Sequence, residues 1–270
     1  MNLLTRRILP LAVAMFVILL FGGCEHGQRA LTPLVEGNNP NALYRLPPMT
    51  DEESDVVYLT IDDGPGDLTP DMLDLLEEFD ATATLFLHTD YIEDDDVLDR
   101  AIAEGHNLAH HMPSDRDWTE VSPEMFKAKF RESHCILARY GEGYAPYFRP
   151  PRAGFDDETM LPVLREAEML GERPVVLATY IPWDAGGVTE WRWRGASRAL
   201  AKRYGWGLGL VARPGDIVLF HDGPSPRLRR TAQSLVSLEI FLKRIDERGL
   251  RAVALPNGPA NTAMCPDGGA

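Results

Sequence analysis

Two adjacent carboxylates end an apolar stretch of the chain near residue 60. Asp62 and Asp63 follow the apolar and β-branched residues that begin at Val56, and the turn dipeptide Gly64-Pro65 comes next. Because neighbouring residues of an extended chain project in opposite directions, we expect the two aspartates to do different jobs. One can face a metal ion while the other faces a water molecule or a substrate. An Asp-Asp-Gly turn that satisfies its own backbone fits the same residues.

A second stretch, residues 105–115, is dense in side chains that bind metals. It reads GHNLAHHMPSD, and histidine nitrogen and carboxylate oxygen are ordinary ligands of zinc. His111 and Asp115 are four residues apart, which would place both on one face of a helical turn. Pro113 favours instead a tight loop, which can also bring them together. We expect His106 to cap or orient backbone groups.

The elements that must position these residues alternate along the chain from residue 55 onward. Apolar, β-branched runs alternate with amphipathic stretches, which predicts an α/β fold with a parallel sheet, open or closed into a barrel. The predicted strands are 56–61, 82–87, 107–111, 147–150, 175–179, 217–220 and 252–255. The predicted helices are 69–79, 97–103, 122–140, 156–170, 197–204 and 228–248.

Polar side chains stand at the ends of four of these predicted strands. They are Asp62 with Asp63, then His111, Arg149 and His221. In parallel α/β folds the carboxyl ends of the strands meet at one edge, where the chemistry is found. The repetition over four strands predicts one shared site more strongly than any single motif does.

At these residues the chain resembles the NodB-homology polysaccharide deacetylases, carbohydrate esterase family 4, over roughly residues 56–255. Thr60-Ile61-Asp62-Asp63 is similar to the Thr-Phe-Asp-Asp motif of that family. The resemblance implies that Asp62 is the catalytic base and that Asp63 is a metal ligand. It also implies a distorted (β/α) barrel with fewer than eight strands.

The second motif departs from the pattern of the family. His111 and Asp115 stand where the family has His-x-x-x-His, so the resemblance implies both as metal ligands, with aspartate in place of the second histidine. A set of Asp63, His111 and Asp115 can hold zinc, the expected ion, or cobalt, manganese or iron. The alternative is that Asp115 does not bind and that the metal site is defective.

The remaining motifs match in part. Arg149-Pro150-Pro151 resembles the Arg-x-Pro motif, in which the arginine orients the base. We expect Pro150 and the backbone N–H of Tyr147 to border the substrate and its oxyanion. The run Leu-Phe-His that ends at His221 resembles the fifth motif, whose histidine is the general acid.

The fourth motif of the family is degenerate in this chain. The stretch that ends in Trp183 and Asp184 occupies its position. By the resemblance Asp184 orients the acid histidine, while Trp183 either stacks on a sugar face or fills the core.

Together these matches imply metal-dependent hydrolytic deacetylation of an acetylated oligo- or polysaccharide, with an N-acetylglucosamine-containing glycan as the expected substrate. The alternative is a non-catalytic glycan-binding lipoprotein on a decayed deacetylase scaffold. A glycosidase would need two carboxylates separated to fit a sugar ring, and Asp62 and Asp63 are adjacent, which disfavours it.

The N-terminus predicts export. Two arginines, a short apolar run and Gly-Gly before Cys24 resemble a bacterial lipoprotein signal, with Cys24 as the lipidated residue, although an uncleaved anchor fits as well. We therefore expect a chain held on a bacterial membrane by its lipid, facing the periplasm. The expected organisation is a signal peptide 1–23, a linker 24–50, a deacetylase-like domain 51–256 and a flexible tail 257–270.

Charge and cysteine content restrict the partners and the compartment further. The formal net charge is −14, which argues against nucleic acid as a partner and is compatible with a neutral or cationic glycan. Besides Cys24 the chain has only Cys135 and Cys265, which could pair in an oxidising compartment.

Overall fold

A computed structural model describes the chain from residue 39 onward, with gaps. The chain divides into two compact units between Pro40 and Asn41, and the sheet, its helices and the candidate site belong to the second unit. Cys24, Trp183 and Asp184 lie outside the described residues. No helix of the described ranges is both long and apolar enough to cross a membrane. Those ranges are 39–48, 50, 53–170, 173–180, 198–222 and 233–265.

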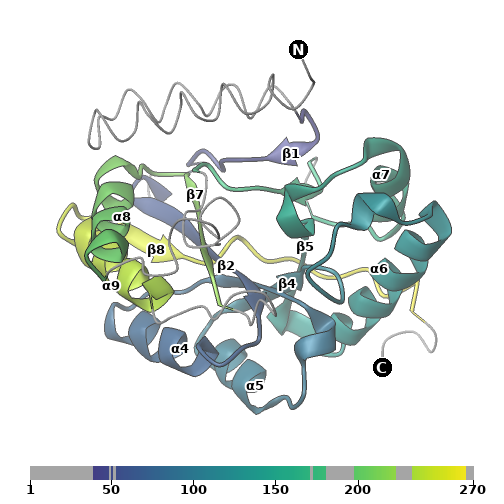
Figure 1. Ribbon diagram of the computed structural model, residues 1–270, viewed down its shortest axis with the longest axis horizontal. Coiled ribbons are helices and arrows are strands. Elements are labelled where there is room, and N and C mark those ends of the chain that lie inside the picture. Colours follow the sequence, from purple (N-terminus) through teal and green to yellow (C-terminus); the bar gives the residue numbers. More distant parts are fainter. Residues whose placement is uncertain are drawn as a thin grey trace. The chain divides into compact units, whose positions relative to one another are not determined.

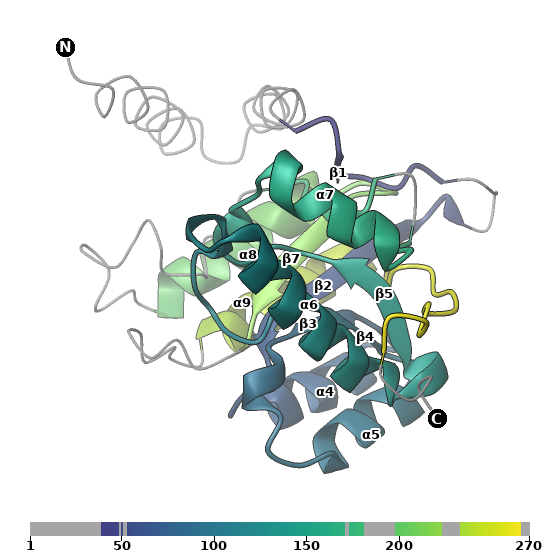
Figure 2. The same ribbon diagram turned by 90° about the vertical axis from the view of Figure 1, so that its right-hand side faces the viewer.

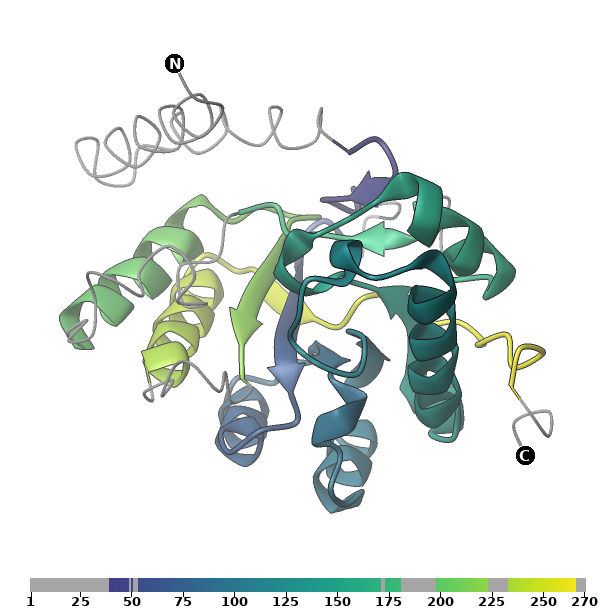
Figure 3. The same cartoon turned by 45° about the vertical axis from the view of Figure 1, so that its right-hand side comes forward.

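The strands form one curled parallel sheet (Figures 1 and 3). Seven of those described follow one another in the order β1-β6-β5-β4-β3-β2-β7, and the short β8 pairs with the first half of β2. This arrangement confirms the predicted α/β fold, a distorted (β/α) barrel, which here is a curled half-barrel with seven strands on its main path. The strands are β1 (Ala42–Leu43), β2 (Val56–Gly64), β3 (Thr84–Leu87), β4 (Asn107–His110), β5 (Tyr144–Phe148), β6 (Val175–Val176), β7 (Ile217–His221) and β8 (Arg251–Val253).

Helices connect successive strands and lie around the outside of this sheet (Figure 2). The longest begins as the sequence predicts, because Ser122 accepts a hydrogen bond from the backbone N–H of Met125 at 3.3 Å and Pro123 occupies the first helical position. The helices are α4 (Thr69–Glu78), α5 (Asp96–Ala103), α6 (Pro123–Ala138), α7 (Asp157–Glu166), α8 (Arg198–Val211) and α9 (Gln233–Asp246).

Strand β2 runs through the centre of the sheet and is buried on both faces. Val57, Leu59 and Ile61 pack in the cluster between the sheet and the helices. Val56 and Tyr58 pack in a second cluster on the inner face of the curl. The alternation of side chains along the strand therefore sends the even-numbered residues inward.

The domain begins earlier than the predicted boundary at residue 51. Ala42 and Leu43 form β1 and pair with β6, and Ala42 is fully buried. The carbonyl of Tyr44 accepts a hydrogen bond from the hydroxyl of Thr179 at 2.6 Å. A two-residue strand is too short to show a hydrophobic period. The Pro- and Asn-rich stretch 24–50 was therefore predicted to be a linker, although Ala42 and Leu43 within it belong to the sheet.

The described part of the predicted flexible tail, residues 257–265, is tied to the domain. His134 of α6 donates a hydrogen bond from Nε2 to the carbonyl of Asn261 at 2.8 Å. Cys265 forms a disulfide with Cys135, also in α6. The Gly/Pro-rich composition predicts a loose end, but the cross-link fixes it.

Gly205 of α8 lies too close to α9 for any side chain. A Cβ at this position would come within 2.2 Å of the carbonyl oxygen of Ser237, whereas a Cβ at Gly207 would meet nothing within 4 Å. We expect Gly205→Ala to lower the free energy of unfolding by about 1–3 kcal/mol. Gly207→Ala should leave it unchanged or raise it by up to about 1 kcal/mol. Urea denaturation followed by circular dichroism would show this, and equal midpoints for the two variants would contradict it.

Candidate active site

A β-bulge at the end of β2 gives the two aspartates different partners. Asp62 pairs in register with Phe86 of β3 and Gly64 with Leu87, so Asp63 is an extra residue between them. Its φ of 71° lies in the left-handed region, which aspartate tolerates better than most residues. The bulge therefore redirects the side chain of Asp63, which regular alternation would send toward the helices.

Asp62 is held by a buried arginine that reaches across the inner face of the sheet. Arg149, directly after β5, donates from Nη1 to Asp62 Oδ1 at 2.5 Å and to Thr60 Oγ1 at 3.0 Å. Its Nε donates to the carbonyl of Val176 at 3.0 Å, and the guanidinium lies 4.2 Å from the ring centre of Phe86. Only 2% of the Arg149 surface is exposed, so the ion pair is shielded from water.

Asp63 lies between two histidines that follow the next two strands of the sheet. Its Oδ1 is 3.3 Å from Nε2 of His88, after β3, and 3.3 Å from Nε2 of His111, after β4. The three side chains are buried, and one ligand atom from each lies within 4.8 Å of the others. Nε2 of His111 is also 3.7 Å from Oδ2 of Asp62, so Asp62 lies at the border of this group.

The other nitrogen of each imidazole is already used. Nδ1 of His111 lies 2.7 Å from the carbonyl oxygen of Arg149, and Nδ1 of His88 lies 3.3 Å from that of Met112. A carbonyl oxygen only accepts, so each Nδ1 carries the proton, and Nε2 of a neutral ring presents a lone pair to Asp63. Metal-binding histidines have this arrangement, because a hydrogen bond at one ring nitrogen orients the other toward the ion.

The arrangement fits a divalent cation better than it fits hydrogen bonds alone. Without an ion, both rings would need a second proton to donate to Asp63, although their centres lie only 4.6 Å apart. In a tetrahedral site with bonds of about 2.0–2.1 Å, neighbouring ligand atoms lie about 3.3 Å apart. The two N–O distances of 3.3 Å match that separation, and two imidazoles with one carboxylate are a donor set that zinc accepts.

The carboxyl group of Asp63 is strongly acidic in this setting. Burial raises its pKa, but the adjacent imidazoles of His111 and His88 and the charge of His221 outweigh burial and hold the pKa well below its usual range. Asp63 is therefore ionised at neutral pH, as a metal ligand must be.

Asp115, which the motif predicts as the third ligand, is not in this group. Its Oδ1 accepts a hydrogen bond from Nε of Arg152 at 2.9 Å, and its backbone carbonyl accepts one from Nη2 of the same residue at 2.9 Å. The four-residue spacing predicts a shared face only if the chain makes a helical turn. Met112 has a φ of 64°, so the chain turns the other way after His111.

The other predicted residues divide between the site and the core. His221, at the end of β7, pairs in register with Asp62 and is 7% exposed, so it lies at the same edge. Pro150 is buried at the start of the 3₁₀ turn η5 (Pro151–Ala153). The side chain of Tyr147 packs in the inner core, where its hydroxyl donates to the carbonyl of Pro256 at 2.8 Å. Its side chain is therefore not part of the site.

Comparison with known proteins identifies the kind of domain. A family model for polysaccharide deacetylases matches residues 50–171. This chain carries a polysaccharide deacetylase domain. A chitooligosaccharide deacetylase from Bradyrhizobium sp. (strain ANU 289) is 27% identical over 210 residues, which are 74% of this chain and 89% of the relative.

A second relative and a solved structure agree with that assignment. A peptidoglycan-N-acetylglucosamine deacetylase from Bacillus cereus is 26% identical over 205 residues, which are 73% of this chain and 68% of the relative. The crystal structure of a polysaccharide deacetylase from Bacillus cereus superposes with a TM-score of 0.60 at 25% identity, covering 75% of this chain and 92% of the other. The deacetylase resemblance read from the motifs is thus confirmed.

His88 is the residue of the deacetylase domain that the sequence did not single out. It follows β3 directly, so the rule that drew attention to His111 after β4 applies to it equally. The predicted strand 82–87 ends immediately before His88, and that position was the available signal. A single histidine in a sequence does not indicate a metal site until the fold places other ligands beside it.

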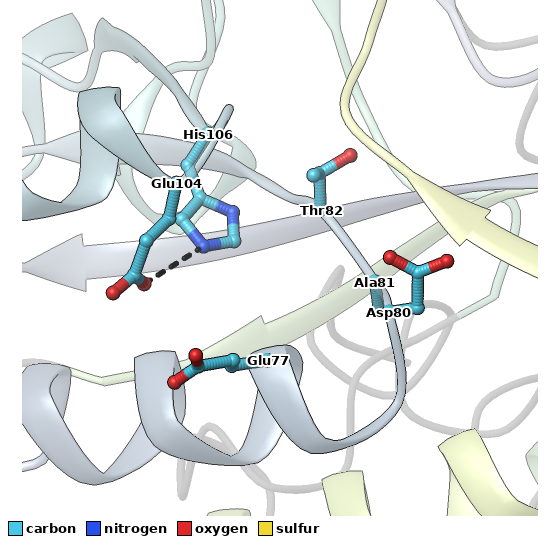
Figure 4. A pocket seen from close by; sticks show the side chains of 6 residues that line it. All are labelled: Glu77, Asp80, Ala81, Thr82, Glu104 and His106. Carbon is cyan, nitrogen blue, oxygen red and sulfur yellow. Dashed lines mark ion pairs between the residues drawn. The ribbon is translucent and has the colours of Figure 1, made fainter.

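The opposite end of the deacetylase sheet holds a separate cavity of about 230 Å³ (Figure 4). His106 lies there and accepts a hydrogen bond at Nδ1 from the backbone N–H of Ala83 at 3.0 Å, which confirms its predicted role toward the backbone. Burial lowers the pKa of His106 to about 4, so the ring is neutral. The lining residues are Glu77, Asp80, Ala81, Thr82, Glu104 and His106.

Proposed function

We propose that this protein hydrolyses the acetyl group of an N-acetylglucosamine-containing glycan in a metal-dependent reaction. The observation that carries the proposal is the convergence at the carboxyl ends of β5, β4, β3, β2 and β7. There the pair of Asp62 and Arg149 meets Asp63, two histidines and His221. The relatives named for chitooligosaccharide and peptidoglycan deacetylation support the choice of substrate.

The contacts of each side chain indicate its role in the proposed reaction. A divalent cation held by the metal-binding group, Asp63, His88 and His111, would supply Lewis acidity toward the acetyl carbonyl and toward a water molecule. Asp62 is the general base: Arg149 occupies its Oδ1, and Oδ2 faces the metal-binding group, where it can accept the proton of the attacking water. Arg149 fixes the orientation of that carboxylate.

His221 is the general acid of the proposed reaction. It lies beside Asp62 in the neighbouring strand, on the far side of β2 from the two histidines. A histidine in this position can give a proton to the departing amine, or to an alcohol if the substrate is an acetyl ester.

Acetate release by residues 25–270 tests this function. The protein would be stripped of metal with a chelator and assayed on N-acetylglucosamine oligomers and on peptidoglycan, before and after addition of zinc, cobalt or manganese. We expect release only after a metal is restored. If the folded protein binds these glycans but releases no acetate with any metal, the non-catalytic glycan-binding alternative replaces this proposal.

We also propose that the chain is exported and anchored to a bacterial membrane through Cys24. The lipoprotein-like residues before Cys24 motivate this, and the Cys135–Cys265 disulfide is of a kind that persists in oxidising compartments. In a bacterial host the full chain should be found in the membrane fraction, and Cys24→Ser should release it or leave its signal uncleaved. Equal membrane content and equal fatty-acid labelling of both forms would contradict the anchor.

A further inference from the structure

We infer that His88 has taken over the third metal-ligand position that residue 115 would otherwise fill. The protein ligands are then Asp63, His88 and His111, all placed at the ends of adjacent strands. The inference deepens the proposed function by assigning the metal its ligands. It rests on that function only for the use made of the metal, because binding can be measured without catalysis.

The surroundings of His88 are those of a ligand. Its side chain is fully buried, and its Nε2 has no hydrogen-bond partner among the described residues although it points at Asp63 Oδ1, 3.3 Å away. A buried nitrogen left in this way destabilises the fold unless an ion or a proton occupies the space before it. The ring is also fixed, since His111 stacks on one side and Tyr91 packs edge-on at 5.2 Å.

Asp115 differs in each of these respects. Its side chain is 22% exposed, and both its carboxylate and its backbone carbonyl are engaged by Arg152. The guanidinium of Arg152 is held there by a backbone with a φ of 59°. Binding a metal would require Asp115 to give up this pair and to turn inward past a loop that starts with a left-handed residue, Met112.

The exchange also changes the charge of the site. Two neutral imidazoles and one carboxylate leave a divalent ion with a net charge of +1, whereas one imidazole and two carboxylates would neutralise it. Asp62 adds a further carboxylate at the border with either ligand set. The set with His88 leaves more positive charge on the ion than the set with Asp115 would, so the ion is the stronger Lewis acid. A histidine at position 88 therefore preserves the chemistry that aspartate at position 115 would weaken.

Metal titration of two matched variants tests the assignment. His88→Gln and Asp115→Asn each remove one candidate donor with little change in volume. Zinc affinity of the metal-free residues 25–270 would be measured by calorimetry, and folding by circular dichroism. We expect His88→Gln to weaken zinc binding by more than about 100-fold, the upper end for loss of an outer-shell partner. Asp115→Asn should change it by less than about threefold.

A measurement on the unaltered protein guards against a variant that does not fold. X-ray absorption of the zinc-loaded protein should show two imidazoles in the coordination shell, and one imidazole would overturn the assignment. Loss of zinc binding in Asp115→Asn, or its retention in folded His88→Gln, would also overturn it. Zinc bound through His88 without any acetate release would leave the assignment standing and reject only the proposed function.

Discussion

Replacement of Asp62 by asparagine is expected to lower the rate of acetate release by about 10²–10⁴-fold, the range for loss of a general base, and to leave the metal bound. Asparagine keeps the shape of the side chain but cannot take a proton from water. The candidate metal group of Asp63, His88 and His111 does not include Asp62, whose Oδ2 lies 3.7 Å from Nε2 of His111.

The measurement is kcat for acetate release together with zinc content by mass spectrometry. Asp67→Asn is the matched control, because Asp67 is an exposed residue just beyond the same strand. Turnover equal to that of the unaltered protein, at equal zinc content, would show that Asp62 is not the base.

Replacement of Arg149 by methionine is expected to impair both stability and turnover. The guanidinium is the cation paired with Asp62, and both groups are more than nine-tenths buried. Removing one partner of a buried ion pair leaves the other charge buried and unpaired, which lowers the free energy of unfolding by about 3–5 kcal/mol. Turnover should fall as well, because the base loses the contact that aims Oδ2 at the metal-binding group.

The double variant Arg149→Met with Asp62→Asn separates these two effects. Because asparagine removes the buried, unpaired charge of Asp62, the double variant should be more stable than Arg149→Met alone. Its turnover should be as low as that of Arg149→Met. Arg152→Met is the control, since that arginine is 45% exposed and its pair with Asp115 should contribute at most about 1 kcal/mol. Urea denaturation that gave the double variant no stability over Arg149→Met would contradict the buried-pair explanation.

The sequence predicted the sheet well where strands are fully buried and bounded by turns. Strand β2 is a continuous apolar run, and such runs are typical of a strand covered on both faces. Strand β7 was found for the same reason. Strand β1 could not be found, because two residues carry no period and their partner β6 lies more than 130 residues away.

The candidate site was predicted in its outline, but His88, one member of its Asp-His-His group, was missed. Strand ends pointed to Asp62, Asp63, His111 and His221, because the edge of a parallel sheet gathers the residues that come directly after its strands. The fate of Asp115 depended on the path of a loop, which a four-residue spacing does not fix. The sequence showed that two aspartates are adjacent, but the bulge that turns Asp63 sideways depends on the register of β3 against β2.

The disulfide between Cys135 and Cys265 makes the second half of the domain a covalent ring. The cross-linked cysteines are 130 residues apart, and the ring contains Arg149 and His221, while the metal-binding group lies outside it. A protease that cuts once between residues 136 and 264 would therefore leave one molecule, in which Arg149 and His221 stay attached to the part of the chain that carries Asp63, His88 and His111. Such a nicked protein would migrate as intact chain on a gel until a reductant separated its two pieces.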